Sequence, residues 1–110
     1  MSYSIETIPS FDRQIKRLAK KYRSVKIDLQ NLVVQLREDP TMGTALGQSC
    51  YKIRVAITSK GKGKSGGSRV ITHIHIAGEI IYLLSIYDKS ERDNLDEGEL
   101  DELLSEIDPA

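Results

Sequence analysis

Six basic side chains gather in the middle of the chain, in a stretch that has no acidic residue. The stretch runs from residue 40 to residue 78, and its basic residues are Lys52, Arg54, Lys60, Lys62, Lys64 and Arg69. Arginine binds phosphate through forked hydrogen bonds and lysine through a compact positive charge. Cations without counter-charges therefore indicate a surface that binds a polyanion such as RNA, although an idle, solvated surface is the alternative.

The spacing of these residues places several of them together. Residues 51–57 alternate in polarity, as in a strand with one buried face, so Lys52 and Arg54 share the other face. Arg69 opens a second predicted strand, residues 68–76, and reaches Lys52 and Arg54 if the two strands pair. Lys89 follows a third apolar strand, residues 80–87, and could close the site. Lys60, Lys62 and Lys64 lie in the intervening Gly/Ser/Lys loop, residues 58–67, and are expected to contact an RNA backbone.

Such a cluster can also cleave RNA, because the 2′-hydroxyl of RNA is a built-in nucleophile. Cleavage requires a base for that hydroxyl, positive charge for the phosphorane-like transition state, and an acid for the leaving 5′-oxygen. Neighbouring cations favour a neutral lysine amine, so Lys52 is the candidate base or proton shuttle. Arg54 and Arg69 would stabilise the charge, and Lys89 would act as the acid or as a phosphate clamp. The scheme requires neither a metal nor a small-molecule cofactor.

The flanking segments predict the elements that position these residues. Residues 3–8 form a predicted strand that Pro9 stops, and Ser10 is expected to cap a helix that reaches residue 22. Ser24 is expected to cap a second helix that ends at residues 39–40, residues 41–50 form a loop, and residues 96–107 form an acidic helix. The predicted order is β-α-α-β-β-β-α. It describes an α+β fold in which an αα-hairpin packs on a twisted, mainly antiparallel four-stranded sheet, with one domain over residues 1–110.

Composition narrows the setting in which this chain is expected to work. The chain has 110 residues, 39% of them hydrophobic, and 16 basic and 16 acidic residues that give zero net charge. No apolar run approaches the roughly 20 residues that span a bilayer, so we expect no membrane partner. Cys50 is the single cysteine, which excludes an internal disulfide and favours the cytoplasm. Acidic residues concentrate in residues 88–108, opposite in charge to the central basic stretch.

The segment CYKIRVAITSKGKGKSGGSRVI, followed by YLLSIYDKSE, resembles the RelE/ParE superfamily of type II toxins, and most closely its RelE/HigB-like branch. The resemblance covers essentially the whole chain and the same order of elements. It implies a ribosome-dependent mRNA endonuclease, with mRNA and the ribosome as partners and a cognate antitoxin protein as inhibitor. Lys52 and Arg54 match the two basic strand residues of the family, Arg69 the arginine of the next strand, and Lys89 the basic residue after the last strand.

Three positions depart from the family pattern. Arg54 stands where lysine is common, Lys89 where arginine is common, and Leu95 near the place of a tyrosine that can stack on a base. Tyr87 is the nearby candidate to replace that tyrosine as an RNA contact. These departures keep two alternatives open: a ParE-like toxin that binds DNA gyrase, or a catalytically inactive member that binds nucleic acid or protein.

Overall fold

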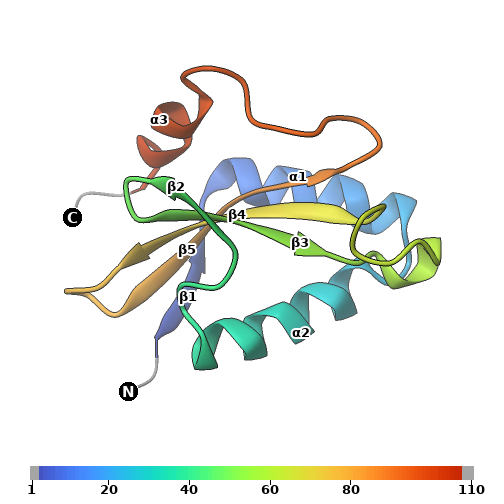
Figure 1. The fold of residues 1–110 in the computed structure, drawn as a ribbon, viewed down its shortest axis with the longest axis horizontal. Coiled ribbons are helices and arrows are strands. Elements are labelled where there is room, and N and C mark those ends of the chain that lie inside the picture. Colours follow the sequence, from blue (N-terminus) through green and yellow to red (C-terminus); the bar gives the residue numbers. More distant parts are fainter. Residues whose placement is uncertain (1–2, 108–110) are drawn as a thin grey trace.

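The computed structural model of the protein describes residues 3–107, which form one five-stranded sheet and three α-helices (Figure 1). The elements are β1 (Ser4–Thr7), α1 (Pro9–Lys21), α2 (Val25–Glu38), β2 (Thr44–Gly47), β3 (Cys50–Val55), the 3-10 turn η1 (Thr58–Lys60), β4 (Ser68–His75), β5 (Ile80–Asp88) and α3 (Glu99–Leu104). The spatial order of the strands is β1-β5-β4-β3-β2, with β1 parallel to β5 and every other pair antiparallel. The predicted α+β class, the αα-hairpin and the mainly antiparallel sheet are confirmed.

The prediction of four strands is wrong by one, because residues 41–50 contain β2 as well as a loop. All four residues of β2 are exposed, so the strand carries no alternation of polar and apolar burial that a sequence pattern could reveal. Its support is backbone pairing, with Thr44 opposite Lys52 and Ala45 opposite Tyr51. A turn through Gln48 and Ser49, both with positive φ, joins β2 to β3.

Two helix starts also differ from the prediction. Pro9 is the first residue of α1 rather than the stop of the preceding strand, since its fixed φ and missing N–H suit the first turn. Ser10 therefore lies inside the helix, and its amide donates to a carboxylate oxygen of Glu106, 2.9 Å away. This distant carboxylate accepts a hydrogen bond from an N–H that an N-cap would otherwise satisfy. The acidic helix is shorter than predicted, because α3 begins after Gly98, which has φ of 81°.

The core lies between the sheet and the helical hairpin. Helix α1 packs against β5 and against α2, while α3 packs against β5 from the end of the chain. The fully buried residues of the core come from the helices and from the central strands: Phe11, Leu18, Leu36, Val70, Ile71, Ile81 and Leu84. β5, the most apolar strand of the sequence, lies between β1 and β4. None of the helices in residues 3–107 is long and apolar enough to cross a membrane.

Two residues of α2 offer a matched test of this core. Leu36 is completely buried, whereas Val34, two positions earlier, is 57% exposed. We expect Leu36→Ala to lower the free energy of unfolding by about 2–5 kcal/mol, because it removes buried methyl groups and leaves a cavity. Val34→Ala should change the same quantity by less than about 0.5 kcal/mol. Urea denaturation followed by circular dichroism measures both, and equal losses would contradict this placement of α2.

Candidate functional site

Side chains of three neighbouring strands meet on one face of the sheet. Arg54 on β3 lies directly opposite Arg69 on β4, and Arg69 lies directly opposite Tyr87 on β5. Residues that are directly opposite share a face of the sheet, and Lys52 joins them because it is two positions from Arg54. The structure thus brings Lys52, Arg54 and Arg69 together as the sequence suggested, and it adds Tyr87 to the same face.

Lys52 and Tyr87 converge on a single oxygen atom. The Lys52 Nζ and the Tyr87 hydroxyl each donate to the carbonyl oxygen of Asp93, both over 3.3 Å. Lys52 also donates to the Asn94 Oδ1, 2.7 Å away. These acceptors belong to the segment that leaves β5 and crosses to α3 in Figure 1. Two donors from different strands are therefore already aimed at one position that an anionic oxygen could occupy.

The Tyr87 hydroxyl is suited to donate a hydrogen bond. Burial raises the pKa of this phenol, and the nearby Arg92 and Arg69 guanidinium groups oppose that shift only in part. The Arg92 guanidinium carbon lies 5.0 Å from the centre of the Tyr87 ring. Because Tyr87 is only 4% exposed, its ring is not available as it stands to stack on a base, and its hydroxyl is the part that reaches the Asp93 carbonyl oxygen.

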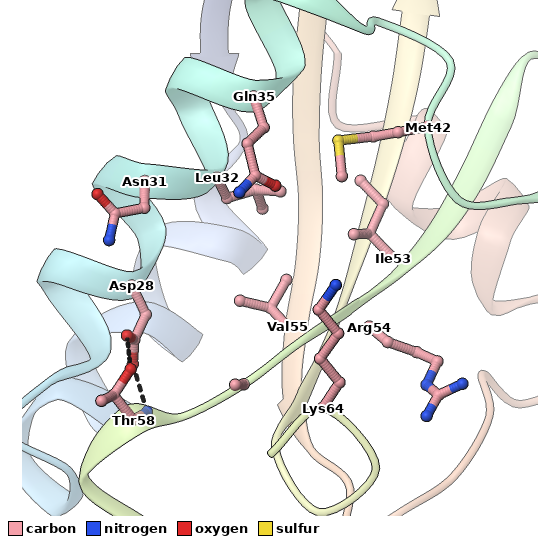
Figure 2. Close-up of a pocket in the computed structure, with 11 residues that line it drawn as sticks. Asp28, Asn31, Leu32, Gln35, Met42, Ile53, Arg54, Val55, Thr58 and Lys64 are labelled. Carbon is pink, nitrogen blue, oxygen red and sulfur yellow. Dashed lines mark hydrogen bonds between the residues drawn. The ribbon is translucent and has the colours of Figure 1, made fainter.

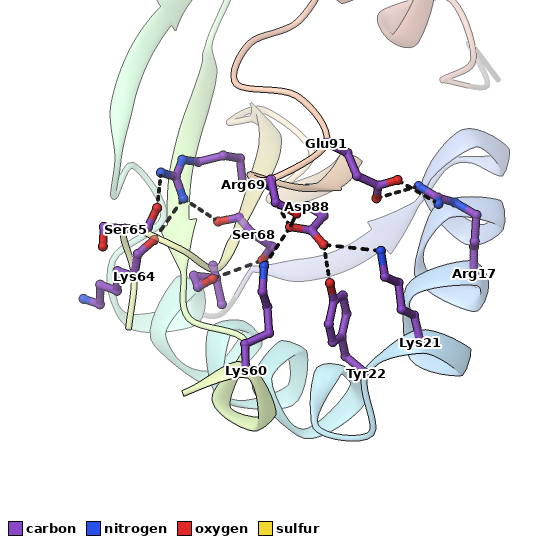
Figure 3. Close-up of polar contacts among 12 residues, drawn as sticks. Arg17, Lys21, Tyr22, Lys60, Lys64, Ser65, Ser68, Arg69, Asp88 and Glu91 are labelled. Carbon is purple, nitrogen blue, oxygen red and sulfur yellow. Dashed lines mark hydrogen bonds and ion pairs between the residues drawn. The ribbon is translucent and has the colours of Figure 1, made fainter. Parts of the chain in front are cut away.

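Arg69 is buried and held by neutral acceptors. It is 5% exposed, and its Nη1 donates to the carbonyl oxygens of Lys64 and Ser68 over 3.0 and 3.1 Å. Its Nη2 donates to the Ser65 carbonyl oxygen over 3.4 Å, as Figure 3 shows. Backbone carbonyls orient the guanidinium without cancelling its charge, so Arg69 still adds a full positive charge to the site.

Arg54, Lys62 and Lys64 are the exposed cations of the site. None of their side chains makes a hydrogen bond or an ion pair within the described part of the chain. Arg54 and Lys64 both line a groove beside β3, and in Figure 2 the Arg54 guanidinium extends away from α2. Their charges are therefore available to a ligand from solution.

Lys60 differs from the other two lysines of the loop, because it points inward. Its side chain is 10% exposed, and its Nζ lies 3.0 Å from the Oδ1 of Asp88, which is completely buried. The Tyr22 hydroxyl donates to the other oxygen of Asp88 over 2.6 Å (Figure 3), and the Ser90 amide donates to Oδ1 over 2.9 Å. Burial by itself would raise the pKa of the Asp88 carboxyl, but hydrogen bonds from Tyr22, Ser90 and Lys60 hold it well below its ordinary value. The ammonium of Lys60 is thus not presented to an RNA backbone.

Lys89 lies beside the site with its charge partly engaged. Its Nζ forms an ion pair with Asp93 over 3.4 Å, and its side chain is 36% exposed. Its backbone amide donates to the carbonyl oxygen of Gly67, which joins the end of β5 to the end of the loop. An exposed ion pair of this kind contributes little to stability, so a ligand could replace Asp93 at low cost.

A groove of about 170 Å³ separates α2 from β3, and nothing in the sequence pattern indicated it. Figure 2 shows side chains of α2 along one side and side chains of β3 along the other. Both apolar and polar residues line it, among them Asp28, Asn31, Leu32, Gln35, Met42, Ile53, Arg54 and Val55. β2 pairs with β3 only as far as Lys52, so the outer edge of β3 is open beyond that residue.

Residues 3–107 contain no group of three or more His, Cys, Asp or Glu side chains arranged to hold a metal ion. Cys50 lies 3.5 Å from the Nδ1 of His73, but burial raises the pKa of its thiol to about 11. A protonated thiol is a poor nucleophile, so this pair does not form a second reactive centre.

Comparison with known proteins identifies the family. The family described as RelE toxin of the RelE/RelB toxin–antitoxin system matches residues 11–107. A mutant of the E. coli toxin RelE in the free state aligns with 96% of this chain and 94% of its own, at 21% sequence identity and a TM-score of 0.59. RelE in the intact E. coli RelBE toxin–antitoxin complex aligns with 79% of this chain and 96% of its own, at 18% identity and a TM-score of 0.62. At these identities the two structures show a shared fold, whereas the family match spans nearly the whole sequence. The chain therefore belongs to the RelE toxin family.

Proposed function

We propose that this protein is the toxin of a type II toxin–antitoxin system, and that it inhibits translation by cleaving mRNA on the ribosome. The observation that carries the proposal is the convergence of Lys52 and Tyr87 on one oxygen, beside the paired Arg54 and Arg69. A scissile phosphate at that position would receive two hydrogen bonds and lie against two guanidinium groups. Such preorganised donors stabilise charge that develops in a transition state.

Each residue has a role in a metal-independent cleavage. Lys52 acts as the base or proton shuttle for the 2′-hydroxyl, whose oxygen then attacks the adjacent phosphorus. Arg54 and Arg69 stabilise the charge on the phosphoryl oxygens, and Tyr87 donates a hydrogen bond to one of them. Lys89 protonates the 5′-oxygen as its bond to phosphorus breaks, which leaves a cyclic phosphate and a free 5′-hydroxyl.

The exposure of each loop lysine indicates whether it can contact RNA outside the scissile phosphate. Lys62 and Lys64 would contact the RNA backbone, because both are exposed and unpaired within residues 3–107. We leave Lys60 out of this set, since Asp88 already holds its ammonium. RNA must also replace the Asp93 and Asn94 oxygens at Lys52, so productive binding requires the 92–95 segment to shift. The ribosome would supply much of the substrate positioning that this requires.

We also propose a cognate antitoxin as the partner that inhibits the protein. A structure of an E. coli RelE mutant in complex with an antitoxin RelB peptide has the same fold, with a TM-score of 0.59 at 17% identity. The groove between α2 and β3 offers such a peptide an open strand edge, apolar side chains, and two free cations, Arg54 and Lys64. A segment bound there would pair with the backbone of β3 and cover Arg54 at the same time.

Cleavage of mRNA in a reconstituted translation reaction tests the enzymatic proposal. We expect Lys52→Ala and Arg54→Ala each to lower the cleavage rate by about 10²-fold or more, because each removes a group that acts in the transition state. Arg37→Ala removes an exposed cation of α2 outside the site and should change the rate by less than about twofold.

Mapped cleavage positions and rates distinguish the outcomes of that experiment. If all three variants cleave like the wild type, this face is not the active site. If the folded wild type does not cleave mRNA at ribosome-occupied positions, the endonuclease proposal is wrong, and gyrase binding or an inactive binding module replaces it.

Antitoxin binding is tested by filling the groove. Gln35 is exposed and lines the groove, whereas Gln30 is exposed on the opposite side of the same helix. We expect Gln35→Trp to weaken binding of the cognate antitoxin about tenfold or more, equivalent to about 1.4 kcal/mol, and Gln30→Trp to leave it unchanged. Isothermal titration calorimetry measures both affinities, and equal affinities for the two variants would place the antitoxin elsewhere.

A further inference from the structure

We propose that Lys60 is a positioning residue for the RNA site: its ion pair with buried Asp88 anchors the 58–67 loop, whose backbone carbonyls then hold the Arg69 guanidinium in place. The link to RNA rests on the function proposed above, whereas the anchoring itself concerns the free protein. Lys60 thereby differs in role from Lys62 and Lys64, although the three lysines alternate with glycine in one short sequence.

The anchor is strong because Asp88 has no access to water. A buried carboxylate is very costly unless cations and hydrogen-bond donors surround it. Lys60 is the close cation, with its Nζ 3.0 Å away and 10% of its side chain exposed. Lys21 is the other one, but its Nζ lies 4.0 Å away and half of its side chain is exposed. Asp88 therefore confines the end of η1 through Lys60 much more than it confines α1 through Lys21.

The loop carries this constraint to Arg69 over a short distance along the chain. Gly61 and Gly63 have φ values of 71° and 65°, so the chain reverses tightly after Lys60. Beyond this reversal, the carbonyls of Lys64 and Ser65 accept from Arg69, together with that of Ser68 in β4. An acceptor only four residues from an anchored side chain has little freedom to move away.

The far end of the loop is also held. The Gly67 carbonyl accepts from the Lys89 amide over 3.0 Å. A Cβ on Gly67 would clash with the backbone of residues 55–57, so glycine is required for this close approach. The loop is therefore held at Lys60 and at Gly67, and the Lys64 and Ser65 carbonyls that accept from Arg69 lie between these two points.

Arg69 needs such support because it lies directly opposite Arg54. Like charges that face each other across two strands repel and are destabilising. In register, Asp88 pairs with Ser68, one position before Arg69, so Asp88 and Arg69 lie at the same end of the sheet on opposite faces, and the loop contacts both. Without the anchor, we expect the loop to move away and Arg69 to lose its Lys64 and Ser65 acceptors and its fixed orientation.

Nuclear magnetic resonance of the isolated protein tests the anchor. The Lys60→Met, Asp88→Asn double variant removes both charges together, so it leaves no uncompensated buried ion. We expect amide hydrogen exchange of residues 61–66 to become at least about tenfold faster, and the Arg69 Nε–H signal to broaden or shift. Lys62→Met, the matched control in the same loop, should leave both observables unchanged, and Lys60→Arg should largely preserve them.

Cleavage kinetics then separate positioning from direct RNA contact. We expect the double variant to lower kcat about tenfold with KM changed less than twofold, because it disturbs a group that acts in the transition state. Lys62→Met should instead raise KM and leave kcat unchanged. An unchanged loop exchange and Arg69 signal in the double variant would overturn the positioning role, whereas a wild type without cleavage would overturn only the proposed function.

A measurement on the wild type keeps the proposal testable if the double variant does not fold. The Lys60 ammonium should give a 15N signal that exchanges with water at least about tenfold more slowly than the ammonium of exposed Lys62. Equal exchange of the two ammonium groups would show that Lys60 is not anchored, and would overturn the proposal.

Discussion

The buried carboxylate of Asp88 is the interaction on which the arrangement of the site depends. Its donors come from three separate parts of the chain: Tyr22 at the end of α1, Lys60 in the basic loop and Ser90 after β5. A charge without access to water is stable only while these donors stay in place. The end of the helical hairpin, the loop and the end of β5 are therefore held at one point, next to the strand pair that carries Arg69 and Tyr87.

The cationic face is held together mainly by neutral acceptors. Arg69 donates to backbone carbonyls, and Lys52 donates to the Asp93 carbonyl and the Asn94 amide oxygen. Carboxylates would bind these cations more strongly, but they would cancel the positive charge that attracts a polyanion. Carbonyl and amide dipoles fix the direction of each side chain and leave its charge intact. Lys89, whose ammonium pairs with Asp93, is the exception.

Several acidic residues after β5 attach elements of the fold to one another instead of pairing with the cations of the site. Glu99 binds the Arg92 guanidinium, and Glu106 accepts from the Ser10 amide in the first turn of α1. A carboxylate at the start of a helix is stabilised by the unpaired amides and by the helix dipole. α3 is thus joined to the segment after β5, and the residues that follow α3 are joined to the helical hairpin. A chain with zero net charge can in this way keep a strongly basic face.

The sequence by itself determined those helices and strands that show a regular spacing of polar and apolar residues. The alternation over residues 51–57 indicated β3 and its cationic face, and the apolar spacing of residues 11–36 indicated the two helices, because burial of one face imposes a period on the chain. β2 was missed because its four residues are all exposed, so its pairing leaves no trace in the pattern.

Only the tertiary structure decided which lysine of the loop turns inward. The local sequences around Lys60, Lys62 and Lys64 are similar. Lys60 differs because it pairs with Asp88, a carboxylate that is 28 residues away in the sequence and that folding removes from contact with water. The position of Tyr87 opposite Arg69 likewise follows from the register between β4 and β5, which long-range packing sets and local spacing does not.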